Sequence, residues 1–147
     1  MSGVWRTVFV ISTAVSLTAS AQPAANVKDL QNHFAACFEP PLSLNGSRLT
    51  FYFSLASNGR MIGGQPRTVW FRLHASESDR QRLFEKASNS LLANCFPVPL
   101  NRDMAKLIPG DVFYLQFAET ERGISALLRP YGSHVSPDDL LYRRYRW

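Results

Sequence analysis

Apolar residues recur at helical spacing in two segments of the chain. The first segment predicts a helix that begins after the N-cap candidate Asn26 and ends before the prolines at 40 and 41, because proline cannot supply a helical backbone donor. The second predicts a helix that opens at residues 78–81, Ser-Asp-Arg-Gln, which have the form of a capping box. The two apolar stripes consist of Val27, Leu30, Phe34 and Cys37 and of Phe84, Ala87, Leu91 and Cys95.

Between these helices, strict alternation of apolar and polar residues over 49–55 predicts a strand with one buried face. The dipeptide Asn58-Gly59 then indicates a tight hairpin turn. Residues 63–66, Gly-Gly-Gln-Pro, interrupt the returning strand, which resumes over 68–73 and should therefore lie at a sheet edge or carry a bulge. In this strand we expect core-facing Val69, Phe71 and Leu73 and outward-facing Trp70 and Arg72.

The later part of the chain predicts a third strand over 111–117, with Tyr114 and Gln116 on its outer face, and a short fourth strand over 124–128. A short C-terminal helix should start at Ser136-Pro137. The predicted fold class is α+β. Two helices pack on one face of a three-stranded antiparallel sheet, in the order helix, strand, strand, helix, strand, with an accessory strand and the C-terminal helix added.

Residues 1–21 have the pattern of a secretory signal peptide. Arg6 is basic, residues 8–17 are apolar, and Ala19-Ser20-Ala21 forms a cleavage site. The alternative is an uncleaved membrane anchor, but the apolar run is shorter than the ~20 residues that a spanning helix needs. We therefore expect cleavage after Ala21 and a periplasmic protein. Its parts would be a linker over 22–26, a domain over 27–119, and an accessory strand and tail over 120–147.

Composition is that of an ordinary folded domain, with 46% hydrophobic residues among 147. The formal net charge is +5, which favours solubility and can steer the protein toward anionic surfaces. An exported protein would seldom meet nucleic acid, so we expect no nucleic-acid partner.

The chain has two cysteines, Cys37 and Cys95, each near the end of a predicted helix on its apolar stripe. In an oxidising compartment this arrangement favours a disulfide that joins the two helices. The alternative is two separate buried thiols. No C-x-x-C motif is present to activate either thiol, so the bond is expected to be structural.

Several motifs together resemble the C-terminal domain of the TonB/TolA class of envelope proteins. They are Cys-Phe-Glu-Pro-Pro at 37–41, the hairpin over 51–59, Gly-Gln-Pro at 64–66, Cys-Phe-Pro-Val-Pro at 95–99 and the aromatic strand over 113–117. The resemblance implies a binding module that recruits extended segments or folded partners and has no catalytic residues. Members that transduce energy keep a membrane anchor and a long linker. With the anchor cleaved and a short linker, this chain is not expected to transmit force across the periplasm.

No catalytic, metal or cofactor motif is found in the sequence. The three histidines lack metal-ligand spacing, and the Gly63-Gly64 pair lacks the lysine of a phosphate loop. The best catalytic candidate combines His74 with Glu77 or Asp79 and a distant serine, but acids near a helix N-terminus are expected for the helix dipole alone. We therefore expect a protein that is not an enzyme and that needs no cofactor.

Two functions fit these patterns. In the first, an envelope or outer-membrane protein adds a strand to the free sheet edge, with Trp70, Arg72, Tyr114 and Gln116 giving selectivity; a second copy could pair at the same edge. In the second, the tail binds anionic envelope surfaces. The tail residues concerned are Arg143, Arg144, Tyr145, Arg146 and Trp147.

Overall fold

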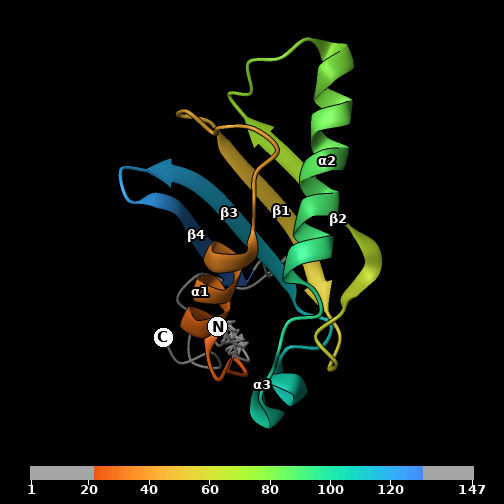
Figure 1. Cartoon of the computed structure of the whole chain (residues 1–147). Helices are drawn as coiled ribbons and strands as arrows, with labels where there is room; N and C mark the ends of the chain where they lie inside the picture. The colour runs from red at the N-terminus through yellow and green to blue at the C-terminus, as the bar shows by residue number, and fades with distance from the viewer. Residues whose placement is uncertain (1–21, 131–147) are drawn as a thin grey trace, which may run out of the picture.

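The computed structural model describes residues 22–130 of the chain (Figure 1). The predicted signal peptide at 1–21 and the predicted C-terminal helix and tail at 131–147 lie outside the described residues. The elements in chain order are α1 (Val27–Cys37), β1 (Arg48–Leu55), β2 (Met61–Phe71), α2 (Glu77–Cys95), α3 (Arg102–Leu107), β3 (Val112–Thr120) and β4 (Gly123–Pro130).

The strands form one antiparallel sheet in the order β2-β1-β3-β4. The α+β class with helices on a sheet is confirmed, but the sheet has four strands where three and an accessory were predicted. β4 pairs with β3 along its whole length, from Gly123 opposite Thr120 to Pro130 opposite Phe113. The predicted domain boundary at 119 therefore falls inside β3, and the sheet continues beyond it.

Both long helices cover the same face of the sheet, α1 over β4 and α2 over β2 (Figure 1). The predicted period-2 strands supply the other half of this core, because alternate side chains of a strand point to one face. The buried strand residues include Leu49, Phe51, Phe53 and Leu55 of β1 and Phe113, Leu115 and Phe117 of β3. Ring contacts such as that of Phe34 with Phe53 join α1 to the sheet.

The predicted disulfide between Cys37 and Cys95 is confirmed. The two residues are the last of α1 and of α2, and their Cα atoms lie 5.3 Å apart. His33 strengthens the same junction, since its Nε2 atom lies 2.9 Å from the Cys95 carbonyl oxygen. The bond therefore ties together the C-terminal ends of the two helices that cover the sheet.

The helix starts agree with the sequence in one case and differ in another. Asn26 caps α1 as predicted, and its side chain accepts a hydrogen bond from the Asp29 amide. The cap of α2 is Ser76, two residues before the predicted Ser78, because Ser76 and Asp79 form the capping pair. The short helix α3, capped by Asn101, was not predicted from the sequence.

The segment expected to be a linker, 22–26, is attached to the domain. Ala24 is buried, its amide donates to the Pro99 carbonyl at 2.8 Å, and its carbonyl accepts from the Asn101 amide at 3.0 Å. These two hydrogen bonds fix the entry into α1 beside the loop that follows α2.

The predicted orientation of β2 was wrong at three positions. Trp70 is buried, with 7% of its surface exposed, whereas Val69 and Phe71 are 42% and 57% exposed. The pairing explains the inversion: Trp70 lies opposite Leu49, which faces the core, and directly paired residues share a face. Four residues of β2, 63–66, lie opposite the single residue Phe53 of β1. This bulge interrupts the alternation of inward and outward side chains, so the orientation of the later β2 residues cannot be counted from the hairpin.

Beyond β2, the expectations for Arg72 and Leu73 are confirmed. Arg72 is exposed and has a left-handed backbone, with φ of 58°. This conformation interrupts the alternation of the strand, so Leu73 returns to the core although Phe71 does not. The Trp70 indole completes the inward face by donating to the Ser47 hydroxyl at 2.9 Å and by stacking on Phe84.

Candidate functional site

The sheet has two outer edges, β2 and β4, and they differ in how they are covered. Helix α1 packs along β4, and the Leu128 amide donates a hydrogen bond of 2.9 Å to the side-chain oxygen of Gln31. Gln31 thus satisfies an outward backbone donor of β4. Among the strands of residues 22–130, β2 pairs with β1 alone.

Edge strand β2 also carries a concentration of exposed apolar side chains. Ile62 is 48% exposed, and Val69 and Phe71 are exposed to a similar degree. Apolar side chains on an uncovered edge invite pairing with another strand, which is why proteins usually protect such edges with charges, prolines or bulges. The β2 edge is therefore the more accessible of the two and the more suited to contact.

The irregularity at residues 63–66 limits the length of the usable edge. Regular pairing with β1 runs from Arg67 opposite Tyr52 to Phe71 opposite Arg48. Pro66 has no backbone donor, and Arg72 leaves the strand conformation. A segment of five residues, 67–71, thus presents regular strand geometry at the edge.

Three of the four predicted contact residues are accessible, and the fourth is not. Arg72 is exposed beside this edge, and its guanidinium carbon lies 5.2 Å from the centre of the Phe71 ring. Tyr114 and Gln116 are half-buried on the face opposite the helices, where the Gln116 amide donates to the Tyr114 hydroxyl at 2.6 Å. Trp70 is buried in the core, so the prediction that it points outward and contacts a partner is wrong.

The sequence did not identify Val69 and Phe71 as surface residues. Their apolar character made them appear to be core positions, and Trp70, which carries a polar N–H, appeared suited to the surface. The only sequence signal of the reversed face is the Gly-Gly-Gln-Pro interruption before the strand, which does not reveal how many residues oppose the bulge.

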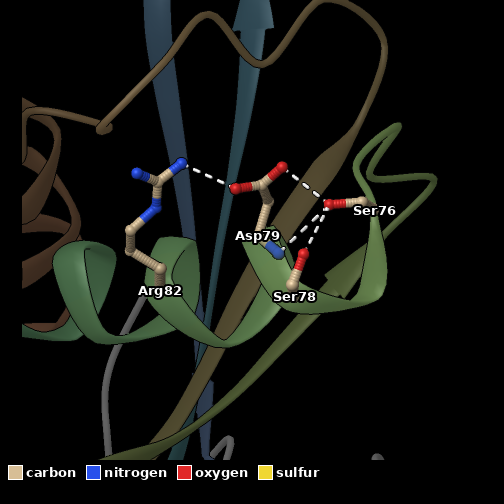
Figure 2. Close-up of polar contacts among 4 residues, drawn as sticks. All are labelled: Ser76, Ser78, Asp79 and Arg82. Atoms are coloured by element: carbon tan, nitrogen blue, oxygen red, sulfur yellow. Dashed lines mark hydrogen bonds and ion pairs between the residues drawn. The ribbon is translucent and has the colours of Figure 1, made fainter.

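The candidate acid at the start of α2 is engaged in helix capping (Figure 2). The Asp79 carboxylate accepts hydrogen bonds from the Ser76 hydroxyl at 2.6 Å and from Arg82 at 2.7 Å. These contacts, first the Ser76 hydrogen bond and then the charge of Arg82, hold the pKa of Asp79 below its ordinary value. The carboxylate is therefore kept ionised as part of the cap.

Within residues 22–130, no group of three or more His, Cys, Asp or Glu side chains could hold a metal ion. In the same range, no helix is both long enough and apolar enough to cross a membrane. The basic-aromatic residues predicted to contact anionic surfaces, from Arg143 to Trp147, lie outside the described part of the chain.

Comparison with known proteins gives one match. The model of a family described as an uncharacterised conserved protein matches residues 20–121, from the segment before α1 to the turn after β3. This match contains no link to the TonB/TolA class. Neither a curated protein nor a solved structure matches the chain.

Proposed function

The chain belongs to the family of the uncharacterised conserved protein UCP034077, and we propose that it is a non-catalytic interaction module of the cell envelope. In this proposal, an extended segment of an envelope or outer-membrane protein binds along the β2 edge as an additional strand. The backbone of residues 67–71 would supply hydrogen bonds, and Val69, Phe71 and Arg72 would select the side chains of the partner.

The observation that carries this proposal is the difference between the two sheet edges. Each edge strand has a helix over its core-facing side, and at the β4 edge the side chain of Gln31 also accepts a hydrogen bond from an outward backbone amide. The β2 edge pairs with β1 alone among the described strands and exposes Val69 and Phe71. Strand addition uses unpaired backbone groups for affinity and alternate side chains for selectivity, and β2 offers both.

A periplasmic location is part of the proposal. A disulfide that joins the two main helices suits an oxidising compartment, because reducing systems keep cytosolic thiols unpaired. The order of elements from α1 to β3 is compatible with the TonB/TolA resemblance, apart from the additional α3, and we propose a distant structural kinship on that basis.

Photocrosslinking can identify the partner. A photoreactive phenylalanine analogue at Phe71 should capture a protein from the envelope fraction of the native cells, whereas the same analogue at Lys86, exposed on α2, should not. Equal capture at both positions would indicate contact without preference for the edge. A crosslink between two copies of the chain would assign the edge to self-association.

Hydrogen exchange then tests the binding mode. With the captured segment bound as a strand, alternate amides within residues 67–71 should gain protection, because alternate backbone groups of an edge strand point outward. Side-chain docking without strand pairing would leave these amides unchanged and would contradict the proposal.

Binding through the tail remains a separate prediction. Removing residues 131–147 should not affect strand addition at β2, but it should abolish binding to vesicles that contain anionic lipid if the tail carries the contact. Loss of vesicle binding at a few hundred millimolar salt, roughly where charges are screened beyond a few ångströms, would favour the electrostatic alternative.

A further inference from the structure

The face of the sheet opposite the helices carries an ordered row of four side chains. The register places Arg67 of β2 opposite Tyr52 of β1, Tyr52 opposite Tyr114 of β3, and Tyr114 opposite Arg129 of β4. Directly paired residues share a face, so these four form a cross-strand row, Arg-Tyr-Tyr-Arg. Three strand spacings separate the two arginines, about 14 Å in all at roughly 4.8 Å per spacing.

Among the described strands, the charged side chains on the face opposite the helices are all basic. Arg67 and Arg129 are exposed, and Arg48 is exposed on the same face, four positions along β1 from Tyr52. The four strands contain a single acidic residue, Glu119. By alternation Glu119 belongs to the other side of β3, the side of Phe117, and its carboxylate accepts hydrogen bonds from the Ser43 hydroxyl and the Asn45 amide. A cationic face of this kind complements an anionic partner.

A hollow next to one end of the row adds an apolar requirement. Tyr52, Arg67, Val69 and Val112 line a hollow of about 360 Å³. Two valines on its wall suit an aliphatic or aromatic side chain, and Arg67 at the same place suits a carboxylate next to that side chain. The site therefore combines an apolar subsite with a charged one.

The row and the hollow together favour an acidic peptide over a nucleic acid. The rings of Tyr52 and Tyr114 meet edge to face, with centroids 5.5 Å apart and planes 72° apart. Successive bases of a single strand need separate ring faces on which to stack, and this packing directs the edge of one ring toward the other. A polysaccharide would lack an apolar side chain for the hollow.

From this geometry we propose that the sheet face opposite the helices binds an acidic peptide segment. One carboxylate pairs with Arg67, a neighbouring apolar side chain enters the hollow, and a second carboxylate about four residues away, at ~3.3 Å per extended residue, pairs with Arg129. This site lies on the face of the sheet and does not require a strand to be added at the β2 edge.

The probe is a synthetic peptide with the sequence Gly-Asp-Leu-Ser-Gly-Asp-Gly-Ser and a fluorescent label. In this peptide a serine-glycine spacer separates the leucine from the second aspartate. Binding to the purified protein is measured by fluorescence anisotropy at low salt, and the contact is located by amide chemical shifts. We expect shifts at the cross-strand row, and a loss of binding when both aspartates become asparagines or when the leucine becomes serine.

Matched protein variants separate the site from general charge. The double variant Arg67→Gln/Arg129→Gln should weaken peptide binding by about tenfold or more. Arg60→Gln/Arg102→Gln, which removes the same charge from an exposed turn and from α3, should weaken it by less than about twofold. Arg67→Lys/Arg129→Lys should recover part of the affinity, because the charge remains and the bidentate geometry is lost. Unchanged unfolding midpoints establish that each variant is folded.

Several results would overturn the proposal. They are no binding of the peptide, equal weakening by the two double glutamine variants, or tighter binding of polygalacturonate or a ten-nucleotide oligothymidylate than of the peptide. Binding that appears only after deletion of 131–147 would assign the face to that segment. A dimer that the Arg67→Gln/Arg129→Gln variant dissociates would assign it to a second copy. Strand addition at the β2 edge is measured separately, by hydrogen-exchange protection of the outward amides within 67–71, so failure of peptide binding here leaves that proposal untouched.

Discussion

Gly59 and Val98 join the β1–β2 hairpin turn to the loop after α2. The Val98 amide donates a hydrogen bond of 2.9 Å to the Gly59 carbonyl. Gly59 is buried with φ of +75°, and a Cβ atom at this position would collide with the Val98 backbone. The turn after β1 and the loop after α2 therefore meet at a position where only glycine fits.

Substitution Gly59→Ala should therefore lower the free energy of unfolding by about 2–4 kcal/mol, because left-handed strain and a backbone collision add. Gly64→Ala is the matched control: its φ is also +75°, but the space around it is open. It should cost only about 1 kcal/mol. Urea unfolding measures both, and equal costs would contradict the collision.

Loss of the disulfide should also lower stability. The bond closes a sequence separation of 58 residues. In the chain-entropy model a loop of this length contributes about 4 kcal/mol through the unfolded state. The variant Cys37→Ser/Cys95→Ser should show this loss by urea unfolding. Alkylation of two cysteines in the native protein without reductant would contradict the bond.

The reversed orientation of β2 can be tested by a pair of adjacent substitutions. Trp70→Ala removes a buried ring and leaves the Ser47 hydroxyl without the indole N–H donor, so it should cost about 3–5 kcal/mol. Phe71→Ala removes an exposed ring and should change stability by less than about 0.5 kcal/mol. If Phe71 faced the core and Trp70 faced outward, as alternation predicts, Phe71→Ala would lower the free energy of unfolding more than Trp70→Ala.

Glu119 should make stability depend on pH on the acid side. Hydrogen bonds from the Asn45 amide and the Ser43 hydroxyl hold the pKa of this carboxyl below its ordinary value of 4.5. Its stabilising contribution is therefore fully present above 4.5 and is lost as pH falls through the lowered pKa of the folded state. The variant Glu119→Gln should show a shallower loss of stability over this range when urea midpoints are compared across acidic buffers.

If Glu119→Gln has the same acid-side slope as the unchanged protein, the carboxylate contacts do not contribute in solution. Ser43→Ala provides an intermediate test, because it removes one of the two donors and retains the charge. Its slope should lie between those of the other two proteins.

Local patterns were sufficient for most elements. The stripe from Val27 to Phe34 predicted α1, and the alternation over 49–55 predicted β1 with its buried face. The two cysteines on helical stripes predicted the disulfide. Each of these features depends on side-chain periodicity or on chemistry within one segment, which the sequence displays directly. Helix α3 was not predicted because its six residues are too few to show a helical repeat of apolar positions.

The sequence by itself determined the segments of α1, α2 and the four strands, the hairpin turn between β1 and β2, and the pairing of Cys37 with Cys95, but not α3. Tertiary structure decided which side of β2 faces the core, because the residues opposite Phe53 can be counted only once the strands are paired. It also decided that β4 completes the sheet, that Gln31 covers the β4 edge, and that Arg67, Tyr52, Tyr114 and Arg129 stand in one row. These relationships join residues that are distant in the chain, and pairing register, which no local pattern encodes, brings them together.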